Sequence, residues 1–332
     1  MLNQELKLNT KIFNPDVEKN STRQGFGEGL LQAGIANDNI VALCADLTES
    51  TKVNIFADKF PERFIQMGIA EQSMPSVASG MASMGKIPFI ASYGIFNPGR
   101  NWEQIRTTIC YNNQNVKIIG SHTGLSVGPD GGSHQALEDI AITRVLPNMV
   151  VISPCDYIEA KKATMASALT KDPTYIRLAR NNTPIITTNE TPFIIGKAQI
   201  IFTPEVGLAH VGIIATGPIL YKAIIAAREL EKKGIKVKVM NLSTIKPLNE
   251  NAIIILAKET KAIVTVEDHQ IAGGMGSAVA ECLSQNYPVA IEFVGINNEF
   301  GQSGTPDELE KHYHIDTIDI IEKAQKVLKR KN

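Results

Sequence analysis

The feature that most constrains the fold is a regular alternation of short β-branched runs with longer amphipathic stretches. In the first half of the chain, the runs that predict strands are 40–45, 87–92, 116–121, 149–154 and 174–179. The stretches that predict helices between them are 23–35, 71–84, 101–111 and 157–169. Because the strand runs are apolar on both faces, the pattern indicates a parallel sheet with helices on both sides.

The alternation pauses once and then resumes. Residues 183–196 contain two prolines and several threonines, a composition typical of a linker. Beyond it, we expect strands at 211–217, 237–242, 262–267 and 289–294, with helices at 218–234, 249–259 and 274–283. The prediction is therefore an α/β chain of two consecutive domains with mainly parallel sheets: an N-terminal extension 1–20, a first domain 21–182, a linker 183–196 and a second domain 197–332.

The bulk composition argues against several classes of protein. The formal net charge is −1, which provides no basic field for nucleic-acid binding. The N-terminus has no apolar signal core, and the most apolar stretch, 211–227, is broken by Pro218 and Lys222 and is too short to span a membrane. The four cysteines lack paired spacing, so we expect reduced thiols in a cytoplasmic protein and no metal site.

Polar and aromatic side chains follow the predicted strands of the first domain. Parallel sheets place their ligands beyond the carboxyl ends of the strands, and several side chains fall there. They are Asp46, Ser50, Glu71, Tyr93, Phe96 and Arg180. The sequence therefore predicts a ligand site at this edge of the first sheet.

The turn "SHTGLSVGPDGGSHQALED", residues 121–139, follows another of these strands. It contains four glycines, which allow backbone to approach a ligand closely, and an apparent helix start at Gln135. His122, Asp130 and His134 could bind hydroxyl groups or transfer protons. The alternative is a glycine-rich surface connection with incidental polar side chains, and the residues alone do not decide between the two interpretations.

Glu71 lies in "MGIAEQSM", among small and apolar residues. Taken alone, it reads as a carboxylate at a helix N-terminus, stabilised by the helix dipole. In the second domain, the stretch "GGMGSA" indicates close backbone packing at a helix start. We expect His269 to be a structural or interface histidine and not a ligand.

The order of the motifs resembles transketolase. In the first domain they are "STRQGFGEGL", "ADLTEST", "RFIQMGIAEQ", "FIASYGIF", "SHTGLSVGPDGGSHQALED" and "YIRLAR"; in the second they are "VEDHQIAGGMGSAVAE" and "FGQSGTPDEL". The resemblance runs from about Ser21 to the region of His314. It implies that the first domain is a pyrimidine-binding domain and the second a transketolase C-terminal domain.

The resemblance covers only the back half of a full-length transketolase. No Gly-Asp-Gly motif occurs in the chain, although that motif begins the family's site for the diphosphate of thiamine diphosphate and its Mg or Ca ion. The resemblance therefore implies a small subunit of a split transketolase. Its partner would be a large subunit carrying that site, and the assembly an α2β2 heterotetramer with a homodimer contact.

The resemblance also implies a reaction and roles for individual residues. The reaction transfers a two-carbon ketol unit from a ketose phosphate to an aldose phosphate, as in the pentose phosphate pathway. Glu71 would share a proton with the aminopyrimidine ring of the cofactor, with Phe96, Tyr93 and Asp46 beside it. The residues that would bind the sugar phosphate are Arg23, Ser50, His122 and Arg180, with Asp130 on a sugar hydroxyl and His134 assisting proton transfer. Arg100 receives no role, because the segment "NPGRNWEQIR" fits some family members only with an inserted residue.

Three alternatives remain open at this point. One is half of another thiamine-diphosphate enzyme, either a deoxyxylulose-phosphate synthase or the β subunit of a 2-oxo acid dehydrogenase. Another is a non-catalytic regulatory subunit that has kept the fold. The last is a specialised transketolase acting on an unusual sugar.

Overall fold

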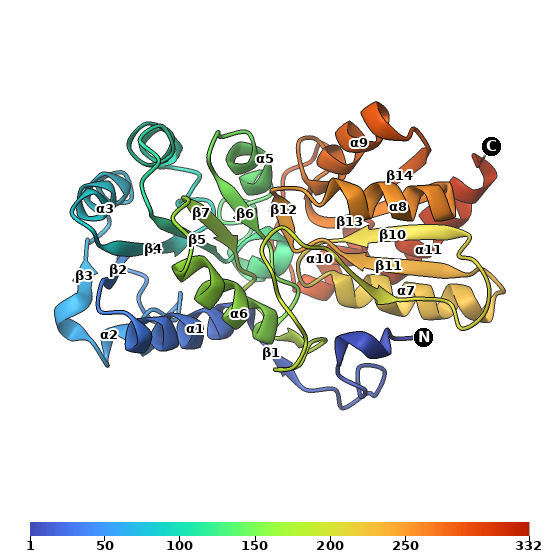
Figure 1. Cartoon of the computed structure of the whole chain (residues 1–332), viewed down its shortest axis with the longest axis horizontal. Coiled ribbons are helices and arrows are strands. Elements are labelled where there is room, and N and C mark those ends of the chain that lie inside the picture. Colours follow the sequence, from blue (N-terminus) through green and yellow to red (C-terminus); the bar gives the residue numbers. More distant parts are fainter. Residues whose placement is uncertain (332) are drawn as a thin grey trace.

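Two sheets, each covered by helices, lie side by side in the computed structural model, which describes residues 1–331 (Figure 1). Nearly all strand pairs in both sheets are parallel, as the alternating pattern predicts. The expected α/β architecture with two mainly parallel sheets is therefore confirmed. The residue bounds of the two domains stay predictions.

The first sheet has seven strands, and most of the predicted site residues follow its strands. In order across the sheet they are β12 (Thr244–Lys246), β6 (Val150–Ile152), β7 (Thr174–Arg177), β5 (Lys117–Ser121), β4 (Ile87–Tyr93), β2 (Ile40–Cys44) and β3 (Phe64–Gln66). All neighbours are parallel except β12, which runs antiparallel to β6. The carboxyl ends of β2, β4, β5 and β7 consequently meet at one edge.

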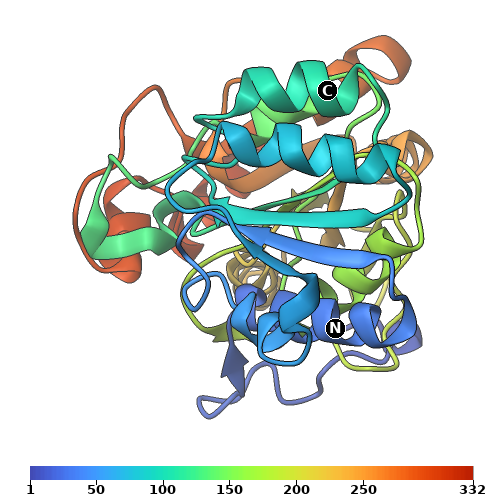
Figure 2. The ribbon, with the colours of Figure 1, turned by 90° about the vertical axis from the view of Figure 1, so that its left-hand side faces the viewer.

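Helices cover both faces of this sheet (Figure 2). One face carries α1 (Thr22–Ala36), α2 (Asn54–Ala57) and α6 (Tyr157–Ala168). The other carries α3 (Ser73–Ser83), α4 (Trp102–Gln104), the π-helical segment η3 (Ile105–Cys110) and α5 (Asp139–Arg144). Side chains of β2 alternate between the two layers: Ile40 and Ala42 pack toward α1, whereas Val41 and Leu43 pack toward α3.

The second sheet has five strands and its own two helical layers. Its strands are β14 (Ala290–Ile296), β13 (Ala262–Gln270), β10 (Val211–Ala215), β11 (Val237–Asn241) and the antiparallel edge strand β9 (Gln199–Phe202). Its helices are α7 (Leu220–Lys232), α8 (Glu250–Thr260), α9 (Met275–Asn286), α10 (Pro306–His312) and α11 (Thr317–Lys329). As expected, "GGMGSA" begins a tightly packed helix: Glu267 accepts the backbone N–H groups of Met275 and Gly276, at 2.7 and 2.8 Å.

The two halves of the chain share structure that the sequence pattern does not indicate. Strand β12 belongs to the second half but extends the first sheet. One apolar core runs from Val151 and Ile245 in the first sheet to Ile214 in the second sheet and Ile253 in α8. Each such side chain contributes about 1.5–3 kcal/mol when it is fully buried, so this shared core holds the sheets together.

The predicted linker and N-terminal extension are both incorporated into the fold. Strand β8 (Thr183–Pro184) of the linker pairs with β1 (Lys19–Asn20). Further upstream, Leu8 and Ile12 are buried in the core of the second sheet. The remaining short elements are the 3₁₀ segments η1 (Gln4–Leu6), η2 (Pro61–Arg63) and η4 (Gly124–Asp130).

The helix start expected at Gln135 is wrong, because α5 begins at Asp139. The carbonyl of Ala136 accepts the N–H of Gly124 at 2.8 Å, which ties residues 135–138 to the preceding loop. A helix starting at Gln135 would need that carbonyl for its own first turn. The helix expected over 101–111 is likewise not regular, since one α-helical turn passes directly into η3.

Candidate active site

Glu71 is a buried carboxylate in the turn between β3 and α3. Its side chain is 5% exposed, and its Oε2 lies 3.3 Å from Nη1 of Arg100. The Asn101 side-chain amide donates to the backbone carbonyl of Glu71 at 3.0 Å and to Asn97 Oδ1 at 3.0 Å. The backbone of Glu71 is thus fixed by a buried amide, and its charge is compensated by one arginine.

Arg100 is a site residue that sequence analysis did not find. Its guanidinium carbon lies 4.5 Å from the centroid of the Phe96 ring, a cation–π distance, while it also contacts Glu71. The inserted residue in "NPGRNW" prevented any match by resemblance. The signal available in the sequence was that Arg100 follows Phe96 by four positions, just after a strand end.

An aromatic and imidazole cluster lies at the ends of β4 and β5. The rings of Tyr93 and His122 stack with centroids 3.9 Å apart, and Phe96 lies 6.3 Å from Tyr93. His134 meets the Phe96 ring edge-on at 5.6 Å. These residues come together because β4 and β5 are parallel neighbours whose register pairs Tyr93 with Ser121. The structure therefore gathers these four predicted residues as expected.

A basic cluster lies at the start of α1 and the end of β7. Arg23 donates to the carbonyl of Ser50 at 2.7 Å and to the carbonyl of Arg180 at 3.1 Å. Arg180 donates to the carbonyl of Val127, and its Nη1 is 3.4 Å from Asp130 Oδ1. Ser50 thus reaches this cluster through its backbone. Within residues 1–331, no carboxylate lies at ion-pair distance from Arg23.

The electrostatics of this cluster favour an anion. Burial, together with the charges of Arg23 and Arg180, lowers the pKa of His122 to about 3. Burial and the nearby Arg180 also lower the pKa of Arg23 from its ordinary value. Each of these groups is therefore less easily protonated than in water, first because it is buried and also because positive charge is already concentrated there. A bound dianion would relieve that repulsion.

Asp46 is the predicted site residue that lies apart. It is exposed at the end of β2 with a backbone φ of +58°, and its N–H donates to Gln66 Oε1 at 2.9 Å. In the part of the chain that the structure describes, its carboxylate makes no hydrogen bond with the aromatic or basic cluster. Its place beside the cofactor stays a prediction.

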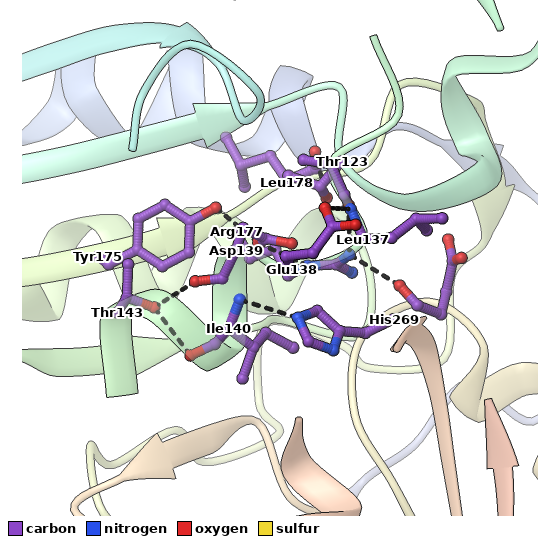
Figure 3. A network of polar contacts seen from close by, with 12 residues as sticks. Thr123, Leu137, Glu138, Asp139, Ile140, Thr143, Tyr175, Arg177, Leu178 and His269 are labelled. Carbon is purple, nitrogen blue, oxygen red and sulfur yellow. Dashed lines mark hydrogen bonds and ion pairs between the residues drawn. The ribbon is translucent and has the colours of Figure 1, made fainter. Parts of the chain in front are cut away.

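A buried polar network behind the 121–139 turn joins the two sheets (Figure 3). Arg177 Nε lies 2.8 Å from Asp139 Oδ2, which also accepts from the Tyr175 hydroxyl at 2.7 Å. Arg177 Nη2 donates to the carbonyl of Asp268 at 2.7 Å, across to β13. The side chains of this ion pair are 5% and 1% exposed, so water screens it very little.

His269 belongs to the same network between the two sheets, which agrees with the prediction of a structural or interface histidine. Its Nε2 accepts the N–H of Ile140 at 3.1 Å (Figure 3). Its Nδ1 donates to the carbonyl of Gln270 at 2.7 Å. Burial lowers the pKa of His269 to about 4, which keeps Nε2 available as an acceptor.

The Asp268 carboxylate fixes the start of the turn. It accepts the N–H of Leu125 at 3.0 and 3.1 Å to its two oxygens. A Cβ on Gly124 would lie 2.0 Å from this carboxylate, and Gly124 has a φ of +67°. Only glycine fits this position, so the second domain sets the course of the turn that carries His134.

Across residues 1–331, no group of three or more His, Cys, Asp or Glu side chains could hold a metal ion. In the same residues, no helix has both the length and the apolar character needed to cross a bilayer. Cys44, Cys110, Cys155 and Cys282 are all buried and unbridged.

Comparison with known proteins assigns the family. The model for the transketolase pyrimidine-binding domain matches residues 18–185, and the model for the transketolase C-terminal domain matches residues 206–320. The chain belongs to the transketolase family. Its two transketolase domains follow one another in the order that the motifs indicate.

Several transketolase relatives have the length of this chain. A transketolase C-terminal section from Methanocaldococcus jannaschii is 43% identical over 93% of this chain and 96% of its own length. A 6-deoxy-6-sulfo-D-fructose transketolase subunit, SqwH, from a Clostridium species is 37% identical over 96% and 98%. By contrast, human transketolase is 36% identical over 90% of this chain but only 48% of its own length.

Solved structures agree with this family assignment. A split gene transketolase, described as an inactive beta4 tetramer, has a TM-score of 0.87 and 41% identity, covering 94% of this chain and 99% of that one. Transketolase from Campylobacter jejuni has a TM-score of 0.78 at 22% identity, which shows the shared fold over 49% of that chain.

Proposed function

We propose that this chain is the small subunit of a split, thiamine-diphosphate-dependent transketolase. With a large subunit it transfers a two-carbon ketol unit from a ketose phosphate to an aldose phosphate. The observation that carries the proposal is that the chain consists of two transketolase domains and has the same length as relatives named as transketolase subunits. The buried Glu71 at the strand ends supports it. The relatives are named as transketolases, which favours this function over a synthase, a dehydrogenase subunit or a regulatory subunit.

The residues around Glu71 fit the aminopyrimidine half of thiamine diphosphate. Glu71 offers a buried carboxylate, and Phe96 offers a ring face that already accepts a planar, delocalised cation. An acid for a ring nitrogen and an aromatic face for the ring are the groups that an aminopyrimidine needs. The diphosphate and its Mg or Ca ion are assigned to the large subunit.

Each residue of this cluster then has a defined task. When bound, thiamine diphosphate supplies the stabilisation of negative charge on carbon that C2–C3 cleavage requires. Glu71 holds a proton at the aminopyrimidine nitrogen, and the Asn101 amide keeps Glu71 in place. Phe96 and Tyr93 pack beside the ring. We also assign Asp46 to the rim of this pocket, and His134, which meets the Phe96 ring, to proton transfer near the substrate.

The basic cluster fits the phosphate of the sugar. Arg23 and Arg180 concentrate positive charge beside the carbonyl of Ser50 and the uncharged His122 ring, and guanidinium groups suit phosphate oxygens. The His122 ring, kept neutral by burial and by the two arginines, still has one N–H that can donate to a phosphate oxygen. Asp130, which lies beside Arg180, is placed to accept from a sugar hydroxyl.

Changing Arg23 to Gln in the assembled enzyme tests the phosphate site. Loss of a charge-assisted hydrogen bond should raise KM for a phosphorylated acceptor roughly 10- to 100-fold. KM for glycolaldehyde, which has no phosphate, should stay at the wild-type value. The matched control is Arg106→Gln, an exposed arginine in η3. Equal losses with both acceptors would remove Arg23 from phosphate binding.

The preferred sugar is part of the proposal. The relatives differ in the sugars that their names give, which include 6-deoxy-6-sulfo-D-fructose and apulose 4-phosphate. We assign pentose-phosphate sugars as substrates, with xylulose 5-phosphate as donor and ribose 5-phosphate as acceptor. We further propose an α2β2 assembly with a contact between two small subunits, acting in the cytoplasm, where buried thiols such as Cys44 stay reduced.

The purified chain alone should catalyse no ketol transfer, because it lacks the Gly-Asp-Gly motif for the diphosphate. Addition of a large subunit that contains Gly-Asp-Gly followed by Asn should restore activity. The measurement is formation of sedoheptulose 7-phosphate from xylulose 5-phosphate and ribose 5-phosphate. Turnover by the lone chain would contradict the split-enzyme proposal.

A further inference from the structure

The contacts of Arg100 involve the same two groups that the proposed function assigns to the cofactor ring. Its Nη1 lies 3.3 Å from Glu71 Oε2, and its guanidinium carbon lies 4.5 Å from the Phe96 centroid. Within residues 1–331, the Arg100 side chain makes no other hydrogen bond, ion pair or cation–π contact. Arg100 therefore depends on a carboxylate and a ring face that the proposed function needs for thiamine diphosphate.

A guanidinium and an aminopyrimidine are recognised by similar chemistry. Both are planar and delocalised, present N–H donors in their plane and stack on aromatic rings. Arg100 contacts the Glu71 oxygen and the Phe96 face that an aminopyrimidine ring would need, so the two groups compete for the same partners.

We propose that Arg100 is a positioning residue that occupies the place of the aminopyrimidine on Glu71 and Phe96, and that it moves away when thiamine diphosphate binds. The inference rests on the proposed function, since it concerns the same pocket. In the subunit without cofactor, Arg100 neutralises the buried Glu71 carboxylate and holds its orientation. In the loaded enzyme, the cofactor takes over both contacts.

The local structure allows the side chain to move without the backbone. The Arg100 side chain is 49% exposed, so it has solvent to move into. The backbone on either side is fixed: a Cβ on Gly99 would lie 2.0 Å from the carbonyl of Ile95, and the buried Asn101 amide holds Glu71 and Asn97. The exchange therefore needs only rotation of one long side chain, which occurs much faster than turnover.

Substitution of Arg100 by Gln in the complete complex tests this exchange. Thiamine diphosphate with Mg²⁺ is titrated into wild-type, Arg100→Gln and Arg106→Gln complexes, and Kd is measured by calorimetry in the absence of sugar. Removal of a competing ion pair and cation–π contact should lower Kd roughly tenfold in Arg100→Gln. Arg106→Gln, an exposed arginine in the adjacent segment, should bind as the wild type does.

The outcomes separate this inference from the function on which it rests. A Kd for Arg100→Gln equal to or higher than that of the wild type would overturn the exchange, because it would mean that Arg100 does not compete with the cofactor. A wild-type complex that does not bind thiamine diphosphate would instead contradict the proposed function. If Arg100→Gln fails to fold, Arg100→Lys serves, since it keeps the charge but lacks the planar group. Its Kd should also fall below the wild-type value, by a smaller factor, and an unchanged Kd would again overturn the exchange.

Discussion

Replacement of Glu71 by Gln in the assembled enzyme should reduce kcat about 10²- to 10⁴-fold, the range typical of lost proton transfer by a positioned side chain. The amide has nearly the same shape, so the hydrogen bond from Asn101 to the backbone carbonyl of residue 71 remains. It cannot exchange a proton with a ring nitrogen, however. Ketol transfer from xylulose 5-phosphate is the measurement, with circular dichroism to confirm the fold.

The matched control is Glu62→Gln, an exposed carboxylate in η2 that pairs with Arg63. This variant should retain wild-type turnover. A Glu71→Gln enzyme with near-normal kcat would remove Glu71 from the reaction. The family assignment would stand, because it depends on the domain matches and not on this residue.

Replacement of Arg177 by Met should destabilise the chain by about 3–5 kcal/mol, as expected when one partner of a buried ion pair is removed. Asp139 would remain 1–2% exposed without its counterion. The hydrogen bond from Arg177 to the Asp268 carbonyl, which joins the sheets, would also be lost. Equilibrium unfolding in urea measures the change.

Two comparisons make this result interpretable. Lys232→Met breaks the exposed pair with Glu229 and should leave the unfolding midpoint unchanged. The double variant Asp139→Asn with Arg177→Met should recover part of the lost stability, because no unpaired charge remains buried. A single Arg177→Met change without effect would mean that the network does not stabilise the junction.

Local pattern was sufficient to predict most of the fold. Strand β2, expected over 40–45, runs over Ile40–Cys44, and α6, expected over 157–169, runs over Tyr157–Ala168. Such elements are marked in the sequence by a continuous apolar run or by helix caps. Both signals lie in neighbouring residues, so local pattern is enough to find them. Strand β12 was missed, since its three residues pair with β6, about ninety positions earlier in the chain. Such pairing leaves no local signature.

The candidate site was predictable to a similar extent. Tyr93, Phe96 and His122 gather as expected because strand order alone brings β4 and β5 together. The ion pair between Arg177 and Asp139 joins residues 38 positions apart, and its existence depends on how the turn folds over β13. The Arg100 contact likewise depends on the path of the 97–101 loop. Their chemical roles stay predictions.

The antiparallel strand that the second half contributes to the first sheet limits where this polypeptide could be divided. A piece ending at the linker would expose the backbone edge of β6 and the apolar side chains that Ile245 and Ile253 now cover. An open edge beside exposed hydrophobic surface recruits other chains and leads to aggregation. The two regions therefore depend on each other for stability and form one folding unit.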